Sequence, residues 1–246
     1  MKYLTPECRE PNKFKKCAEQ QFKNHYKYSG DVEYTTELGI SKNHDYSKYK
    51  GSKILVVGGG PSTRDCHWDP NDYDYIFSCN HFFLAQKLQG VHVDFAAICP
   101  EVDVRSEAFT NYLNNSSALF CIENPDVPLD NVNYLMSTGR LSLVSLRVNL
   151  KLGTTGKLLI VASHFKPARI DVVGFDGVPK NGSSAGDDSG HAFQPGKKFF
   201  RTYTYDRCLQ ELKFTWDYVK NISKDTKFKN LGHGHPYNAS TELNIL

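Results

Sequence analysis

The chain has 246 residues, of which 39% are hydrophobic and 23% are charged, and its net charge at neutral pH is +3. A chain of this length is expected to bury a large core without disulfides or a structural metal. The weak positive charge argues against a dedicated nucleic-acid-binding protein, which would carry a strongly basic surface. No apolar run approaches the roughly 18 residues that a membrane-spanning helix requires.

The cysteines and the N-terminal residues bear on the compartment. Seven cysteines are scattered along the chain, and none forms a Cys-x-x-Cys pair, which disfavours a zinc ribbon and favours a reducing environment. The polar opening, Met1–Pro6, is unlike a signal peptide. We therefore expect a cytoplasmic protein, and we leave open whether it associates with a membrane surface or with further copies of itself.

Composition divides the chain in two. Residues 1–50 are rich in Lys, Tyr, Asn and Glu, which predicts a polar N-terminal extension with a helix near residues 13–26; a loosely ordered tail is the alternative. Residues 51–246 are expected to form the α/β domain. Strands are predicted at residues 54–57, 75–79, 93–98, 118–122, 169–174 and 227–231, and helices at residues 105–113, 156–165 and 204–221.

Strands that alternate with helices predict a single Rossmann-like, doubly wound and mostly parallel sheet, in which ligands bind at the carboxyl ends of the strands. The first strand ends in Gly58-Gly59-Gly60-Pro61-Ser62, which we call the glycine loop. Three glycines let the backbone approach a ligand closely, and a helix starting near Ser62 would aim N–H groups at a phosphate. Thr63 replaces the third glycine of the dinucleotide fingerprint. A tight turn without a ligand is the alternative.

Further motifs follow other predicted strands. Asn80 ends the second strand, where its amide suits a base or ribose but also suits a helix cap. Gly153-Thr154-Thr155-Gly156 opens an apolar helix and offers hydroxyls and N–H groups, or is a plain N-cap. Asp176 ends a later strand and leads into a long polar loop that contains His191.

Two patterns that suggest a metal are discounted. Asp72-Tyr73-Asp74 precedes a strand and should therefore lie at the opposite edge of the sheet. Gly232-His233-Gly234-His235 has no neighbouring carboxylate or cysteine. No metal site is predicted.

Taken in order, these motifs resemble those of sialyltransferases, above all the bacterial family that builds lipooligosaccharides. That family has Gly-Asn-Gly-Pro-Ser at the glycine loop and Cys-Asn at Cys79-Asn80. Its Thr-Ser-Gly is similar to Thr154-Thr155-Gly156. Its Gly-x-Asp, Asn-Gly-Ser-Ser and Gly-His are similar to Gly174-Phe175-Asp176, residues 181–184 and Gly190-His191. Animal sialyltransferases, and a group of pterin pyrophosphokinases and flagellin-modifying proteins, are more weakly similar.

The resemblance spans residues 53–231 and implies a GT-A-like glycosyltransferase. It implies metal-independent transfer of sialic acid or another sugar from a nucleotide-sugar, such as a CMP- or UDP-sugar, to a glycan hydroxyl, without a cofactor. By the same resemblance, His191 is the general base and Asp176 belongs to the catalytic site. The nucleotide-sugar would contact the glycine loop, Asn80, Thr154, Thr155, Gly156 and Lys180.

Some positions depart from that family. Its first-loop Asn is Gly59 here, its phosphate-binding tyrosines align near Val178 and Ala185, and an Asn after its third strand aligns near Cys99. Cations and hydroxyls are then the candidates for stabilising the departing phosphate: Thr155, Lys180, Lys197, Lys198, Arg201 and Tyr203.

Other functions stay open. A pyrophosphokinase on the same scaffold would need Mg²⁺ on carboxylates such as Asp176, Asp187 or Asp188. A nucleotide- or glycan-binding module would bind without turnover. Metal dependence separates the two enzymes, and any turnover excludes the module.

Overall fold

A computed structural model describes residues 40–122, 128–144, 146, 153–177, 191–194, 205–232 and 242–243. Several sequence predictions fall outside these residues: the helix near 13–26, the candidate phosphate ligand Lys180, and the histidines at 233 and 235. Within the described residues, no helix is both long and apolar enough to cross a lipid bilayer.

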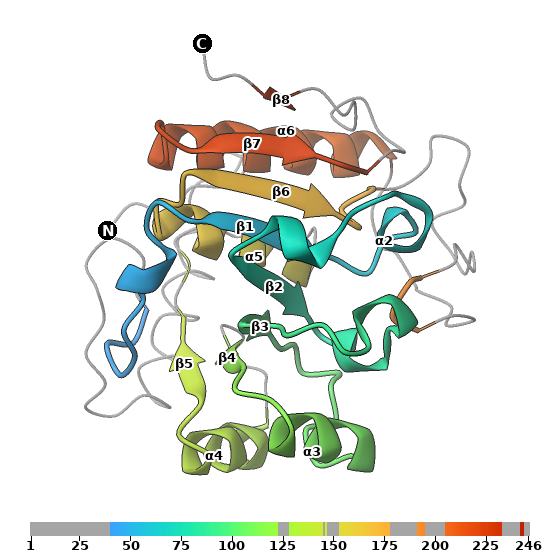
Figure 1. Ribbon diagram of the computed structural model, residues 1–246, viewed down its shortest axis with the longest axis vertical. Coiled ribbons are helices and arrows are strands. Elements are labelled where there is room, and N and C mark those ends of the chain that lie inside the picture. Colours follow the sequence, from blue (N-terminus) through green and yellow to red (C-terminus); the bar gives the residue numbers. More distant parts are fainter. Residues whose placement is uncertain are drawn as a thin grey trace.

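The centre of the molecule is one eight-stranded sheet with the order β5-β4-β3-β2-β1-β6-β7-β8 (Figure 1). Strands β1 to β7 pair in parallel, and only β8 runs antiparallel to its neighbour. The strand bounds are β1 Lys53–Val57, β2 Tyr75–Cys79, β3 Phe95–Ala97, β4 Leu119–Ile122, β5 Leu141–Leu143, β6 Arg169–Val173, β7 Lys227–Asn230 and β8 Glu242–Leu243. The predicted α/β class and the mostly parallel sheet are confirmed.

The central strands are apolar because both of their faces are covered. In β1, the residues after Lys53 are all buried, and its Leu55 lies opposite Ile76 of β2 and Asp171 of β6. A parallel strand covered on both faces reads as a continuous apolar run, and this is the pattern that predicted it. The buried carboxylate of Asp171 is balanced by Arg169 Nε at 2.7 Å and by the Tyr73 hydroxyl at 2.8 Å.

Helices flank the sheet. Helix α5 (Thr154–His164) packs on β1, β2 and β3 and also against α6 (Tyr205–Ile222), and Figure 1 shows both helices behind the sheet. The shorter helices follow the first strands: α2 (Ser62–Asp65), α3 (Glu107–Asn114) and α4 (Leu129–Ser137). Single 3₁₀ turns, η1 to η4, occupy Ser47–Tyr49, Pro70–Asp72, Phe82–Leu84 and Gln86–Leu88.

Residues 40–50, which composition assigned to the extension, pack on the domain. Tyr49 is fully buried and contacts Phe77 and Phe165 at ring-centroid distances of 4.9 and 5.1 Å. Farther along the sheet, Ser41 N–H donates to the carbonyl of Leu143 in β5 at 2.9 Å, so this segment lies along the β5 edge.

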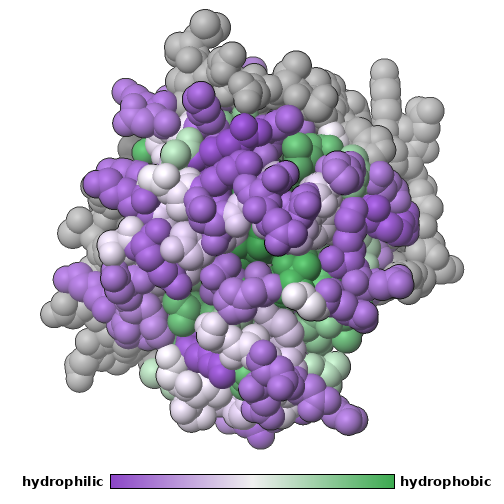
Figure 2. Space-filling view, viewed as in Figure 1, coloured by the Kyte–Doolittle hydropathy of each residue, from purple (hydrophilic) through white to green (hydrophobic). Residues whose placement is uncertain are grey.

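The outer surface is mainly polar. Figure 2 shows a mostly hydrophilic face on which apolar side chains form only small patches. Among the described residues, the large apolar side chains that are most exposed are Leu84 and Met136, each 45% exposed. The apolar surface is therefore concentrated between the sheet and its helices.

Candidate functional site

The order of the strands reverses between β1 and β6. From β1 the chain proceeds through β2, β3, β4 and β5 on one side, and it then crosses back to place β6 on the other side of β1. In a doubly wound sheet, the crevice outside the carboxyl ends of such a strand pair is where ligands bind. The glycine loop leaves β1 at this point, and Gly174-Phe175-Asp176 leaves β6 beside it.

Backbone hydrogen bonds join the two strand ends. Gly58 N–H donates to the carbonyl of Val173 at 2.8 Å, and Gly60 N–H donates to the carbonyl of Gly174 at 2.9 Å. The Thr63 hydroxyl donates to the carbonyl of Gly58 at 2.6 Å. The glycine loop is thus a fixed turn after β1 that lies alongside the end of β6.

The loop requires glycines because other side chains pack directly on it. A Cβ at Gly58 would lie 2.7 Å from Oγ1 of Thr155, and one at Gly60 would lie 2.8 Å from the carbonyl oxygen of Gly174 and would overlap the Asp176 carboxylate. The space beside Gly60 therefore holds a protein carboxylate. The sequence reasoning attributed these glycines to the approach of a ligand, but close internal packing already requires them.

Asp176 binds the N-terminus of α2. Helix α2 begins at Ser62, as predicted, but ends at Asp65 after about one turn. The Ser62 N–H that was expected to face a phosphate donates instead to Oδ2 of Asp176 at 2.8 Å. The Ser62 hydroxyl accepts the N–H of Gly174 at 2.8 Å. The anion at α2 is therefore the protein's own carboxylate. Contact of Ser62 with a nucleotide-sugar stays a prediction.

His191 lies on the glycine loop. Ala192 N–H donates to the carbonyl of Gly59 at 2.9 Å, and the imidazole sits so close to Gly59 that a Cβ there would overlap Nε2 and Cε1. Nδ1 of His191 accepts the backbone N–H groups of Phe193 and Gln194, each at 3.3 Å. Since Nδ1 is an acceptor, the neutral ring in this arrangement carries its proton on Nε2.

The N-terminus of α5 adjoins the same loop. Its N-cap residue is Gly153, with φ of 79°, and as a glycine it offers no side chain to cap this end. The Thr155 hydroxyl lies beside Gly58 and 3.4 Å from the sulfur of Cys79. Burial raises the pKa of the Cys79 thiol to about 12, so this thiol stays protonated at neutral pH. The Thr155 hydroxyl therefore lies beside a neutral group.

Asn80 ties three elements together. Its backbone has φ of 55°, its side-chain N–H donates to the Thr154 hydroxyl at 3.1 Å, and its side-chain oxygen accepts the N–H of Cys99 at 3.1 Å. The amide thus connects the end of β2 with α5 and with the turn after β3. It does not cap the following 3₁₀ turn, where no side-chain cap bond occurs. Contact with a base or ribose stays a prediction.

Two glycines that the sequence motifs include, Gly174 and Gly232, are required by packing at this site, a role that sequence reasoning did not assign to them. Gly174 has φ of 73°, and a Cβ there would overlap the Thr63 hydroxyl. Gly232, after β7, packs on Asp176 and would place a Cβ 2.8 Å from the Ser62 hydroxyl. Gly174 directly follows β6 and Gly232 lies two residues after β7, so their place after predicted strands is the signal that could have shown this role.

The discounted Asp72-Tyr73-Asp74 pattern lies at the amino edge of the sheet, as predicted. The Asp74 carboxylate accepts the N–H of Lys53, the first residue of β1, at 2.7 Å. Among the residues that the structure describes, no group of three or more His, Cys, Asp or Glu side chains is arranged to hold a metal. Metal independence of any reaction stays a prediction.

No protein-family model and no curated protein matches this chain. Among solved structures, the crystal structure of the sialyltransferase CST-II in complex with a trisaccharide acceptor and CMP is similar to it. The alignment covers 77% of this chain and 88% of that chain, with 14% sequence identity and a TM-score of 0.45. A likeness of this degree identifies no activity, so function has to be argued from the site.

Proposed function

We propose that this protein is a glycosyltransferase that binds a nucleotide-sugar in the crevice between β1 and β6 and transfers the sugar to a hydroxyl of a glycan. One observation carries the proposal. The motifs that resemble the sialyltransferase family are far apart in sequence, yet Thr155, Asp176 and His191 each lie against the glycine loop at the switch point of the sheet.

The donor phosphate is best placed at α5 rather than at α2. The first N–H groups of an α-helix have no partner within the helix and attract anions. At α2 the Asp176 carboxylate holds that position, and it would repel a second anion. At α5 the Gly153 cap lacks a side chain, and the hydroxyls of Thr154 and Thr155 lie in the first turn. A CMP- or UDP-sugar would place its phosphate there, beside the glycine loop.

In the proposed reaction, the acceptor oxygen attacks the anomeric carbon, the bond from that carbon to the phosphate oxygen breaks, and a base takes the hydroxyl proton. We assign the base to His191, because a ring near Gly59 would adjoin that phosphate. Nε2 must be bare to accept the proton, so activation has to move the ring proton to Nδ1 and break its contacts with two backbone N–H groups. At 3.3 Å these contacts are long for hydrogen bonds.

The departing phosphate needs a stabilising partner. Of the candidates named from the sequence, the Thr155 hydroxyl lies at the site. Lys180, Lys197, Lys198, Arg201 and Tyr203 lie outside the described residues. Their contribution is an expectation that ligand-bound experiments have to test.

Thermal stabilisation by nucleotides tests the proposal. A ligand that binds only the folded state at a concentration of 100 Kd adds about 2.7 kcal/mol, or roughly 5–10 °C in Tm for a chain of this size. We expect CMP or UDP to produce such a shift, and the matching nucleotide-sugar to be consumed in the presence of a glycan. Stabilisation only by ATP with Mg²⁺ would favour a pyrophosphokinase. Binding without turnover on any acceptor would leave a binding module.

A further inference from the structure

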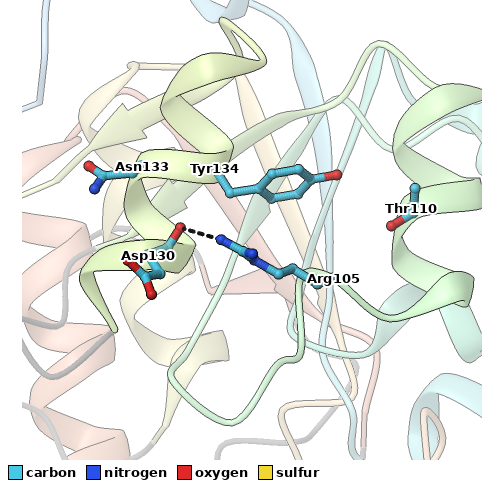
Figure 3. Close-up of a pocket in the computed structure, with 5 residues that line it drawn as sticks. All are labelled: Arg105, Thr110, Asp130, Asn133 and Tyr134. Carbon is cyan, nitrogen blue, oxygen red and sulfur yellow. Dashed lines mark hydrogen bonds between the residues drawn. The ribbon is translucent and has the colours of Figure 1, made fainter.

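A hollow lies toward the carboxyl edge of the sheet, beside the connections that follow β3 and β4. It has a volume of about 460 Å³, is open to solvent, and is lined by Arg105, Thr110, Asp130, Asn133 and Tyr134 (Figure 3). Arg105 and Thr110 belong to the connection that follows β3, and the other three belong to α4, which follows β4. Connections of this kind leave a parallel sheet at its carboxyl edge, where ligands bind.

The lining side chains come from two helices and the loop between them. Asp130, Asn133 and Tyr134 are spaced i, i+3 and i+4 on α4, so they share one face of that helix. Thr110 of α3 stands across the hollow, and Arg105 lies between the two helices (Figure 3). Asp130 and Asn133 are exposed, and Tyr134 is half-buried. Polar side chains thus lie on both sides of one aromatic ring (Figure 3).

Arg105 holds that ring in place. The guanidinium carbon lies 5.7 Å from the centre of the Tyr134 ring, and one guanidinium nitrogen donates to the backbone carbonyl of Asp130 at 3.5 Å. A cation over an aromatic face is attracted to it. Arg105 therefore links the loop before α3 to α4 and steadies the Tyr134 ring as a platform.

We propose that this hollow binds a neutral hexose unit of the acceptor glycan. A sugar ring can place its C–H face on Tyr134 and its hydroxyls on the Asp130 carboxylate, the Asn133 amide and the Thr110 hydroxyl, all of which accept or donate hydrogen bonds. The charge of Arg105 is offset by that of Asp130, so the lining is not suited to a polyanion. The volume falls within the roughly 300–1,000 Å³ of small-molecule sites.

The distance from the glycine loop suits an acceptor that extends along the sheet edge. Neighbouring strands lie about 4.8 Å apart, so β1 and β4 are separated by about 14 Å across β2 and β3. An oligosaccharide with its reactive end in the β1–β6 crevice would reach the hollow with a later sugar. This reading rests on the proposed glycosyltransferase function, but the hollow can be tested without any turnover.

The test is a titration of the ¹⁵N-labelled full chain with maltose, cellobiose and lactose, followed by amide chemical shifts. We expect at least one disaccharide to shift resonances within residues 105–113 and 129–137. Tyr134→Ala should weaken its binding about fivefold to tenfold, from the loss of the aromatic contact. Asn133→Ala, at an exposed position, should weaken it in a protein that keeps its fold. Met136→Ala, on the same helix and 45% exposed, is the matched control and should bind as the wild type.

The outcomes separate the two proposals. Absence of shifts in those segments with all three disaccharides, or wild-type affinity in both Tyr134→Ala and Asn133→Ala, overturns the hexose site. Tighter binding of glucuronate than of every neutral disaccharide overturns its neutral specificity. CMP and UDP are titrated separately: disaccharide binding without nucleotide binding supports the hollow while removing the proposed function.

Discussion

A methyl group at position 59 tests whether the His191 ring packs on the glycine loop. The three atoms nearest to a Cβ on Gly59 would all belong to the His191 imidazole, and Gly59 is not among the glycines with positive φ, so alanine adds no backbone strain. In the free protein, Gly59→Ala should therefore displace the imidazole ring of His191. Overpacking of this kind costs about 1–3 kcal/mol, which lowers Tm by about 2–12 °C. If His191 is the base, turnover should fall about 100- to 10,000-fold.

The double variant makes this reasoning quantitative. His191→Ala removes the ring, so in that background Gly59→Ala should cost almost nothing further in Tm, which is a coupling of about 1–3 kcal/mol in stability. Thermal unfolding and initial rates are measured on all four proteins. Gly90→Ala is the control: it has φ of 76° and nothing within 4 Å of an added Cβ, so it should lose stability but keep its turnover. Equal destabilisation by Gly59→Ala with and without His191 would refute the contact.

Three further expectations concern chemistry and stability. His191→Ala should leave nucleotide affinity nearly unchanged and remove the acidic limb of the rate–pH profile. If His191→Ala keeps a normal rate while His233→Ala or His235→Ala is inactive, the base lies after β7. Turnover should survive EDTA; loss that Mg²⁺ restores would favour the pyrophosphokinase. Asp176→Ala leaves the N–H of Ser62 without its acceptor and should lower the free energy of unfolding by about 1–3 kcal/mol in urea. Asp176→Asn keeps a carbonyl acceptor and should lose less, and equal losses would mean that charge, not this bond, stabilises α2.

Much of the sheet could be predicted because its strands are continuous apolar runs. The β5 edge of the sheet was harder to predict. Strand β5 has only three residues, and α4 has no side-chain cap and follows a short connection, so neither left a clear periodic or terminal signal. Residues 40–50 were misleading in another way: their composition is polar, yet Tyr49 fills the core with one large side chain. A single buried ring is invisible to an average over many residues.

The location of the candidate site could be predicted from the sequence, but the contacts between its side chains could not. Parallel strands bring their carboxyl ends to one edge, so the glycine loop, Thr155 and Asp176 had to lie near one another. Which group faces which depends on the path of the connecting loops. Nothing in the sequence indicated that Asp176 would bind Ser62 or that His191 would cover Gly59. The glycines were therefore identified as a ligand-binding loop, whereas the structure explains them by internal packing.

The segment that runs along β5 also guards the sheet against self-association. The N–H of Leu143 donates to the Ser41 hydroxyl at 3.0 Å, and the Asn43 amide donates to the carbonyl of Leu141 at 2.7 Å. The hydroxyls of Tyr46 and Ser142 are hydrogen-bonded to each other at 2.8 Å. An uncovered outer strand is a template on which a second chain adds its own strand. A chain that begins at residue 51 would expose this edge strand and the cavity left in the core by the loss of Tyr49. We expect it to form concentration-dependent aggregates in sedimentation velocity, where a chain beginning at residue 40 stays dispersed.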